Sequence, residues 1–189
     1  MYSGGLDSLG TLYKLLTEDE YKEYCIHVHH IHNKNIERRD LAEAITVRAV
    51  LDELVKLGYS FEYSESEITS PVYDGHFLWD TDTINFFAGF VCSVNPQIEK
   101  IAIGMQRNDF SQSLSERRER ADRILAAFTS VKKIYPVMDL TKREIYELLP
   151  ETLKLKFWSC RRPIYEEKAI KPCLKCDTCL ILKQQGIRS

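Results

Sequence analysis

Short apolar segments alternate with amphipathic ones along this chain of 189 residues, and the alternation limits the folds that it can adopt. Segments rich in β-branched and aromatic residues indicate strands, whereas apolar residues at three- and four-residue spacing indicate helices. Strands that alternate with helices form a parallel sheet covered on both faces, so the pattern predicts an α/β fold. The expected strands are 25–31, 59–63, 100–103 and 133–137, and the expected helices are 9–24, 37–57, 82–94, 116–128 and 141–149.

The chain is expected to divide into an α/β domain over residues 1–150 and a C-terminal extension over 151–189. Hydrophobic residues make up 44% of the sequence, which is enough to bury a core. Thr141 precedes Glu144 by three residues, and this capping-box pattern predicts the start of the last expected helix. Residues 64–80, with Pro71 and Gly75, are expected to form a loop.

A glycine-containing turn, Ser3 to Ser8, directly precedes the first expected helix. Glycines allow close approach of the backbone to phosphate oxygens, which free N–H groups at a helix N-terminus can bind. Asp7 would then hold Mg²⁺ or orient the pyrophosphate. The alternative is a flexible turn with a helix cap. Only Met1 and Tyr2 precede the turn, so we expect the natural chain to begin further upstream or this one to lack its first strand.

Four cysteines lie within the last thirty residues, whereas Cys25 and Cys92 stand alone in apolar surroundings. Clustered thiolates in a reducing compartment indicate a metal site, and four of them fit tetrahedral Zn²⁺. An iron–sulfur cluster and a redox-active cysteine pair are the alternatives. The predicted zinc ligands are Cys160, Cys173, Cys176 and Cys179.

The turn, written SGGLDS, resembles the phosphate loop of the PP-loop, or N-type, ATP pyrophosphatase superfamily. Two later segments resemble 7-cyano-7-deazaguanine synthases of queuosine biosynthesis. These are 135–145, which ends in Thr-Lys-Arg-Glu-Ile, and the tail, with Trp-Ser-Cys at 158–160 and three spaced cysteines at 173–179. The resemblance implies a Rossmann-like, three-layer parallel-sheet fold of the adenine nucleotide α-hydrolase type with a zinc-binding extension.

The middle of the chain follows that family only in part. In the segment 104–117 five residues fit the family's pattern and the rest depart from it, so the resemblance is to a diverged relative. It implies ATP binding by Ser3, Gly4, Gly5, Leu6, Asp7, Ser8 and Gly104, catalytic roles for Asp7 and Asp109, and substrate binding by Asp109, Phe110, Ser111 and Arg117.

The function that the resemblance implies is an ATP-dependent carbon–nitrogen ligase. Such an enzyme adenylates 7-carboxy-7-deazaguanine, or a related deazapurine acid, and uses ammonia to form an amide and then a nitrile. Mg²⁺ would accompany ATP. Two alternatives stay open: a PP-loop enzyme that modifies tRNA or another nucleic acid, and a non-catalytic nucleotide-binding partner subunit.

Bulk composition limits the partners. The formal net charge of −2 gives no overall basic excess for a nucleic-acid backbone. No apolar run reaches the length of a membrane span and no signal peptide is visible, so a cytoplasmic protein is expected. The resemblance also implies that a homodimer can form. Histidines 27, 29, 30 and 32 alternate between the two faces of a strand, where hydrogen-bonded roles are favoured over a metal site.

Overall fold

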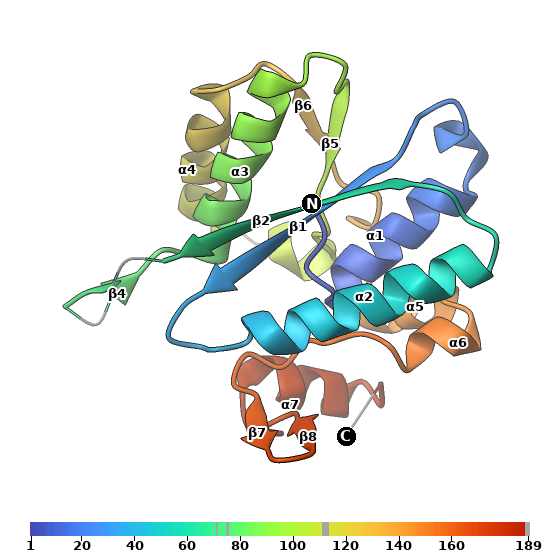
Figure 1. The fold of residues 1–189 in the computed structure, drawn as a ribbon, viewed down its shortest axis with the longest axis vertical. Helices are drawn as coiled ribbons and strands as arrows, with labels where there is room; N and C mark the ends of the chain where they lie inside the picture. The colour runs from blue at the N-terminus through green and yellow to red at the C-terminus, as the bar shows by residue number, and fades with distance from the viewer. Residues whose placement is uncertain (71, 75, 111–113, 188–189) are drawn as a thin grey trace.

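The computed structural model describes residues 1–70, 72–74, 76–110 and 114–187. Figure 1 shows the arrangement of its helices and strands. In chain order the elements are α1 (Leu6–Thr17), η1 (Asp19–Tyr21), β1 (His27–Lys34), α2 (Asp40–Lys56), β2 (Glu62–Thr69), β3 (Val72–Tyr73), β4 (His76–Phe77), α3 (Asp80–Val94), β5 (Lys100–Ala102), η2 (Arg107–Phe110), α4 (Ser115–Ala126), β6 (Lys132–Ile134), α5 (Lys142–Leu148), α6 (Glu151–Lys154), β7 (Ile164–Glu166), β8 (Ala169–Lys171) and α7 (Asp177–Gln184).

The described strands form two parallel pairs and two short antiparallel pairs. β1 pairs with β2 over eight residues and β5 pairs with β6 over three, both in parallel. β3 with β4 and β7 with β8 form the antiparallel hairpins. The mixed α/β class with a C-terminal cysteine cluster is therefore confirmed.

The expected continuous three-layer sheet is not present among the described residues, because the two parallel pairs are separate sheets. Only Met1 and Tyr2 lie between them. The Tyr2 amide donates to the His29 carbonyl oxygen at 2.8 Å, and the Met1 amine donates to the Ala102 carbonyl oxygen at 3.2 Å. Two residues are too few to form a strand that would join β1 to β5.

Two apolar clusters lie on the two sides of this N-terminal segment. The larger one packs α1, α2, α5 and α6 around buried side chains such as Leu9, Leu54 and Phe157. The smaller one joins α3, α4 and β5 through Ala88, Leu125 and other apolar residues. Since α1 packs in the larger cluster, this packing also holds the N-terminus of α1 in place.

Several element boundaries differ from the sequence-based expectations. The first helix ends at Thr17 rather than at residue 24, and β2 continues to Thr69 through the first part of the expected loop. The sequence of β2 is mostly Ser and Glu, and its side chains alternate between half-buried and exposed positions. This sequence has no apolar face that would indicate a strand. The segment is a strand because it pairs with β1 along its whole length. The capping box of Thr141 and Glu144 at the start of α5 is confirmed.

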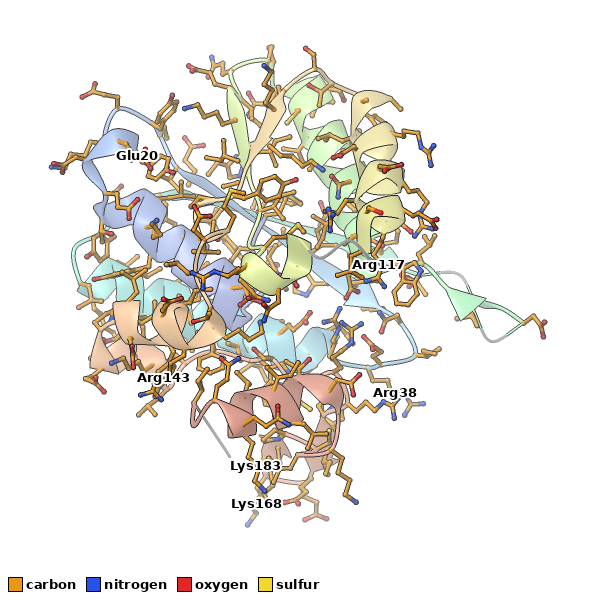
Figure 2. The ribbon with its side chains drawn as sticks, turned by 180° about the vertical axis from the view of Figure 1, so that it is seen from behind. Glu20, Arg38, Arg117, Arg143, Lys168 and Lys183 are labelled. Atoms are coloured by element: carbon orange, nitrogen blue, oxygen red, sulfur yellow. The ribbon has the colours of Figure 1, made fainter. Side chains whose placement is uncertain are left out.

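β7, β8 and α7 form a small lobe beside α2 (Figure 1), whereas α6, which also falls within residues 151–189, packs in the larger apolar cluster. Leu182 and Ile187 bury their side chains in the larger apolar cluster. Arg143 of α5 donates to the carbonyl oxygens of Gln185 and Gly186, both at 3.3 Å. In Figure 2 Arg143 lies beside this lobe, which carries Lys168 and Lys183. Among the described residues, no helix has both the length and the apolarity needed to cross a membrane.

Candidate functional site

The predicted phosphate loop forms a tight turn at the N-terminus of α1. Gly4 has a φ of +77°, a left-handed conformation that favours glycine, and Gly5 is the N-cap residue without a side-chain cap. The Ser3 and Ser8 hydroxyl oxygens lie 3.1 Å apart, and the Ser8 hydroxyl donates to the Gly5 carbonyl oxygen at 3.0 Å. This turn presents the first main-chain N–H groups of α1 in the way that favours an anion.

Gly104, which the resemblance assigns to ATP binding, lies directly against this turn. A Cβ atom at this position would lie 2.6 Å from the Ser8 amide nitrogen and 2.8 Å from the Asp7 carbonyl carbon. Backbone atoms at such distances cannot move aside easily, so only glycine fits. The segment after β5 therefore borders the loop, and the structure brings Gly104 together with residues 3–8.

The Asp7 carboxylate faces the start of α5 and forms an ion pair with Lys142. Burial raises the pKa of Asp7, the positive charge of Lys142 opposes that shift, and the negative charge of Asp109 adds to it. The second carboxylate oxygen, Oδ1, is buried and has no hydrogen-bond partner among the described residues. One oxygen of the Asp7 carboxylate is thus paired with the Lys142 ammonium group, and the other is available as a ligand for a cation.

Asp109 is placed near the loop by the short helix η2. Its carboxylate accepts a hydrogen bond from the Gln106 amide at 2.9 Å, and the Arg107 amide donates to the Leu140 carbonyl oxygen at 3.0 Å. These bonds tie η2 to the segment that leads into α5. The charge of Asp109 acts on Asp7, so the two predicted catalytic carboxylates lie close enough to influence each other.

Arg117, another predicted substrate residue, contacts a ring outside the loop. The guanidinium of Arg117 stacks on the Trp79 ring, 3.8 Å from its centroid, and Figure 2 shows Arg117 at the start of α4. The backbone of Phe110 ends η2. Ser111 lies outside the described residues. Of Asp109 and Arg117, Asp109 is the one whose charge acts on the loop, through its effect on the pKa of Asp7.

A cavity of about 140 Å³ opens beside the loop. Ser3, Ser8 and Gly104 line one side of it. The other side carries three charged groups that the sequence did not single out: Arg39, Glu43 and Asp80. Arg39 forms ion pairs with Glu43 at 3.1 Å and with Asp80. Burial raises the pKa of Glu43 to about 7, against the lowering effect of Arg39.

Arg161 connects this charged group to the cysteine tail. It donates to both carboxylate oxygens of Glu37, at 2.9 and 3.0 Å, and lies 3.3 Å from a carboxylate oxygen of Asp80. Paired guanidinium and carboxylate groups of this kind fix relative orientation. Glu37, Arg39 and Glu43 lie close together in the sequence, whereas Asp80 and Arg161 lie far from them along the chain, so no local pattern links these last two to the network.

The four tail cysteines come together as predicted. Their sulfur atoms all lie within 4.8 Å of one another, and the Cys176 and Cys179 sulfurs are 3.5 Å apart. Main-chain amides donate to two of them: Cys173 to the Cys160 sulfur at 3.2 Å, and Cys176 to the Cys173 sulfur at 3.3 Å. This closed four-sulfur set can hold a metal ion such as Zn²⁺, whose bonds to sulfur are about 2.3 Å.

The strand histidines form hydrogen bonds, as favoured from the sequence. His27 and His29 share the Ser64 hydroxyl, each at 2.7 Å, and His30 bonds to the Tyr2 carbonyl oxygen at 2.9 Å. Burial lowers the pKa of His29 to about 4, so that side chain is neutral at physiological pH. Among the residues that the structure describes, the tail cysteines are the one group with metal-binding geometry. Cys25, expected in apolar surroundings, is exposed, while Cys92 is buried.

The Ser3–Ser8 turn, near the N-terminus, thus lies beside the residues that lead into the C-terminal cysteine cluster. Comparisons of the chain with protein-family models, with curated proteins and with solved structures gave no match. The likeness to ATP pyrophosphatases therefore depends on the short motifs quoted above and on the geometry around them.

Proposed function

We propose that this protein binds ATP at the Ser3–Ser8 loop and adenylates a substrate carboxylate, with release of pyrophosphate. The observation that carries the proposal is the left-handed turn at Gly4, which opens α1 next to Gly104 and the Asp7–Lys142 ion pair. N–H groups at a helix N-terminus bind phosphate oxygens, and a lysine beside them adds positive charge. In the three-layer architecture that the motif resemblance implies, ATP lies at the carboxyl ends of the strands.

The proposed reaction has two rounds. A substrate carboxylate oxygen attacks the α-phosphorus of ATP, the bond from that phosphorus to its bridging oxygen breaks, and pyrophosphate leaves. Ammonia then attacks the acyl carbon, AMP leaves with the carboxylate oxygen, and loss of a proton gives an amide. In the second round the amide oxygen is adenylated in the same way. It departs with AMP while the nitrogen loses its remaining protons, and the product is a nitrile.

In such a reaction the protein contributes mainly by positioning the reactants and by stabilising the charge that develops on the phosphates. Lys142 is suited to leave Asp7 for a phosphate oxygen when the nucleotide enters, because both groups border the loop. Mg²⁺ fits beside Asp7, whose buried Oδ1 has no partner within the described part of the chain, and it would neutralise pyrophosphate charge when bound. Asp109, held by the Gln106 amide, would orient the acid or the ammonia.

We propose 7-carboxy-7-deazaguanine, or a related deazapurine, as the acid. The support from the site is the charged cavity beside the loop, where Glu43 and Asp80 offer carboxylate oxygens and Arg39 offers N–H donors. A guanine-like edge presents adjacent N–H donors, which carboxylates accept, and an oxygen, which a guanidinium can bind. The substrate would then lie between this cavity and the α-phosphate.

We assign Zn²⁺ to the cysteine cluster in a structural role. Four sulfur ligands close the coordination sphere, and a structural zinc site leaves no position for a substrate. Its support for the reaction is indirect, because Ser159 and Arg161 flank Cys160 and reach the loop and the charged cavity. The metal content of the purified protein tests this assignment, and one equivalent of zinc without iron is expected.

An ATP–pyrophosphate exchange assay tests the central claim. Exchange is expected only when 7-carboxy-7-deazaguanine or a related acid is present, and mass spectrometry after adding ammonium should find the amide and nitrile. The Asp7→Ala variant should lose exchange with little change in its circular dichroism. Asp52→Ala, at an exposed position of α2, is the matched control and should retain it. Full exchange in Asp7→Ala would refute the role of the loop, and bound ATP without any exchange in the unmodified protein would favour a non-catalytic subunit.

A further inference from the structure

The charged network beside the proposed phosphate loop carries one negative charge in excess. Three carboxylates share two guanidinium groups, and the five residues are Glu37, Glu43, Asp80, Arg39 and Arg161. When all five groups are ionised, one carboxylate has no counter-charge of its own. Such a charge is costly in a buried place unless a proton or a cation compensates it.

Glu43 is the carboxylate with the least compensation. Its side chain comes from the first turn of α2 and is only 6% exposed. Among the described residues its ion pair is with Arg39, at 3.1 Å, whereas Glu37 and Asp80 each contact both guanidinium groups. Burial raises the pKa of Glu43 to about 7, the charges of Arg39 and Arg161 oppose this shift, and those of Asp80 and Glu37 add to it. Glu43 therefore exchanges a proton close to neutral pH.

The cavity of about 140 Å³ that Glu43 lines also has neutral polar groups in its wall. Thr83 of α3 and His29 of β1 line it, and each has one buried polar atom, Oγ1 and Nε2, without a hydrogen-bond partner in the described part of the chain. His29 is uncharged, because burial lowers its pKa to about 4. A hydroxyl oxygen and a neutral imidazole nitrogen can each accept a hydrogen bond from a small N–H donor.

The proposed reaction needs a base at its second step. In neutral water ammonia is almost entirely present as ammonium, whose nitrogen has no free electron pair and cannot attack an acyl carbon. A general base is most effective when its pKa lies near the working pH, as that of Glu43 does. The acid is proposed to lie between this cavity and the α-phosphate, so nitrogen bound beside Glu43 would approach the activated carbon from the cavity.

We propose that the cavity binds ammonium and that Glu43 is the base that converts it to ammonia beside the acyl-adenylate. This inference rests on the proposed adenylation. The Glu43 carboxylate takes one proton, and the freed electron pair of the nitrogen attacks the acyl carbon while the C=O electrons move to the oxygen. As these electrons return, the bond to AMP breaks, AMP leaves, and the nitrogen loses a second proton to water. Glu43 then releases its proton to solvent.

Hydroxylamine as an alternative nucleophile tests this role. Much of it is unprotonated at neutral pH, so it attacks an acyl-adenylate without a base. Ammonium and hydroxylamine are supplied separately, with ATP and 7-carboxy-7-deazaguanine saturating, and mass spectrometry follows amide with nitrile in one case and hydroxamate in the other. In Glu43→Gln the ratio of the ammonium rate to the hydroxylamine rate should fall on the order of a hundredfold, the typical effect of losing a general base.

The ratio separates the proposed role from a structural one. Weaker binding of the acid or a disturbed loop slows both reactions and leaves their ratio unchanged. Glu62→Gln, at an exposed position of β2, is the matched control and should keep the ratio of the unmodified protein. An unchanged ratio in Glu43→Gln would overturn the proposal.

The unmodified protein provides a second measurement, which does not depend on how Glu43→Gln folds. The acyl-adenylate is formed in advance, and limiting ammonium is then added at several pH values. The rate should rise about tenfold per pH unit up to about pH 7 and level off above it, where Glu43 is ionised and ammonium still predominates. A rate that keeps rising in the same way above pH 7 would overturn the proposal, because free ammonia from solution would then be the nucleophile. Absence of ATP–pyrophosphate exchange would instead overturn the adenylation itself, so the two failures are distinct.

Discussion

The backbone amide of Trp158 donates a hydrogen bond to the carbonyl oxygen of Gly4 at 2.9 Å. The next residue, Ser159, accepts a hydrogen bond from the Leu6 amide at 3.4 Å, and Cys160 of the metal cluster follows directly. The cysteine cluster and the proposed phosphate loop are therefore joined by two residues and two hydrogen bonds. A metal ion that holds the cysteines in position would therefore also hold the backbone of the proposed phosphate loop in position.

Loss of the metal should accordingly weaken ATP binding at a distance. Cys160→Ser removes one ligand and should release Trp158 and Ser159 from the turn, because a structural zinc site is stabilised by all of its ligands. We expect the zinc content to fall and the dissociation constant for ATP to rise on the order of tenfold, which corresponds to about 1.4 kcal/mol. Metal analysis and calorimetric titration measure the two quantities.

The exposed thiol of Cys25 provides the control for this variant. Cys25→Ser removes a cysteine of the same chemistry outside the cluster and should leave both zinc content and ATP affinity unchanged. A zinc-free Cys160→Ser protein that binds ATP as tightly as the unmodified protein would show that the link between cluster and loop has no functional effect.

Gly104→Ala should disturb the loop through direct overlap. The added Cβ would lie 2.6 Å from the Ser8 amide nitrogen and 2.7 Å from its Cα, so the backbone of either segment must move. We expect a loss of about 1–3 kcal/mol in the free energy of unfolding, together with weakened ATP binding. Thermal unfolding and nucleotide titration provide the two measurements.

Gly58→Ala separates the two effects. Gly58 has a φ of +89°, and a Cβ atom added there would meet nothing within 4 Å, so alanine is strained at this position without any overlap. It should lower the melting temperature modestly through backbone strain and leave ATP binding intact. If both alanine variants reduced ATP binding equally, the position of Gly104 beside the loop would not be the cause.

The local features that a short stretch of sequence determines were predicted well. The capping box at Thr141 and Glu144 needs only residues that are neighbours along α5, and the tail cysteines need only a tight turn and one returning loop. The turn at Gly4 likewise depends on glycine's own conformational freedom. Each of these features has a signature that does not depend on distant parts of the fold.

The features that depend on distant partners were missed in the sequence or are not shown by the structure. The polar strand β2 gains its hydrogen bonds from β1, and its sequence alone resembles a loop. The pairing of Arg161 with Glu37 joins residues 124 positions apart, which no periodic pattern encodes. The continuous sheet is not shown among the described residues, where Met1 and Tyr2 alone lie between β1 and β5.

Glu43 should make the stability of the protein depend on pH. Its pKa is raised from 4.5 to about 7, chiefly by burial, so the folded state retains a proton that the unfolded state has already lost. Stability from this group is complete below about pH 4.5 and is lost as the pH rises toward 7, by up to about 3 kcal/mol. Glu43→Gln should remove this decline, whereas Glu62→Gln, at an exposed position, should not. Denaturant unfolding at several pH values checks both, and an unchanged decline in Glu43→Gln would contradict the assignment.

Lys142 should be required for adenylation more than for folding. Its ammonium group pairs with Asp7 at the border of the loop, where it can stabilise the charge of the departing pyrophosphate. Lys142→Met keeps most of the side-chain volume and should slow ATP–pyrophosphate exchange on the order of a hundredfold, the typical effect of removing one stabilising donor. Lys22→Met removes an exposed lysine that pairs with Asp19 and should have no effect. Because the charge of Lys142 lowers the pKa of Asp7, its loss should also shift the acid limb of the exchange profile to higher pH. Normal exchange with an unshifted profile in Lys142→Met would mean that the ion pair is structural, and that the loop meets the nucleotide without it.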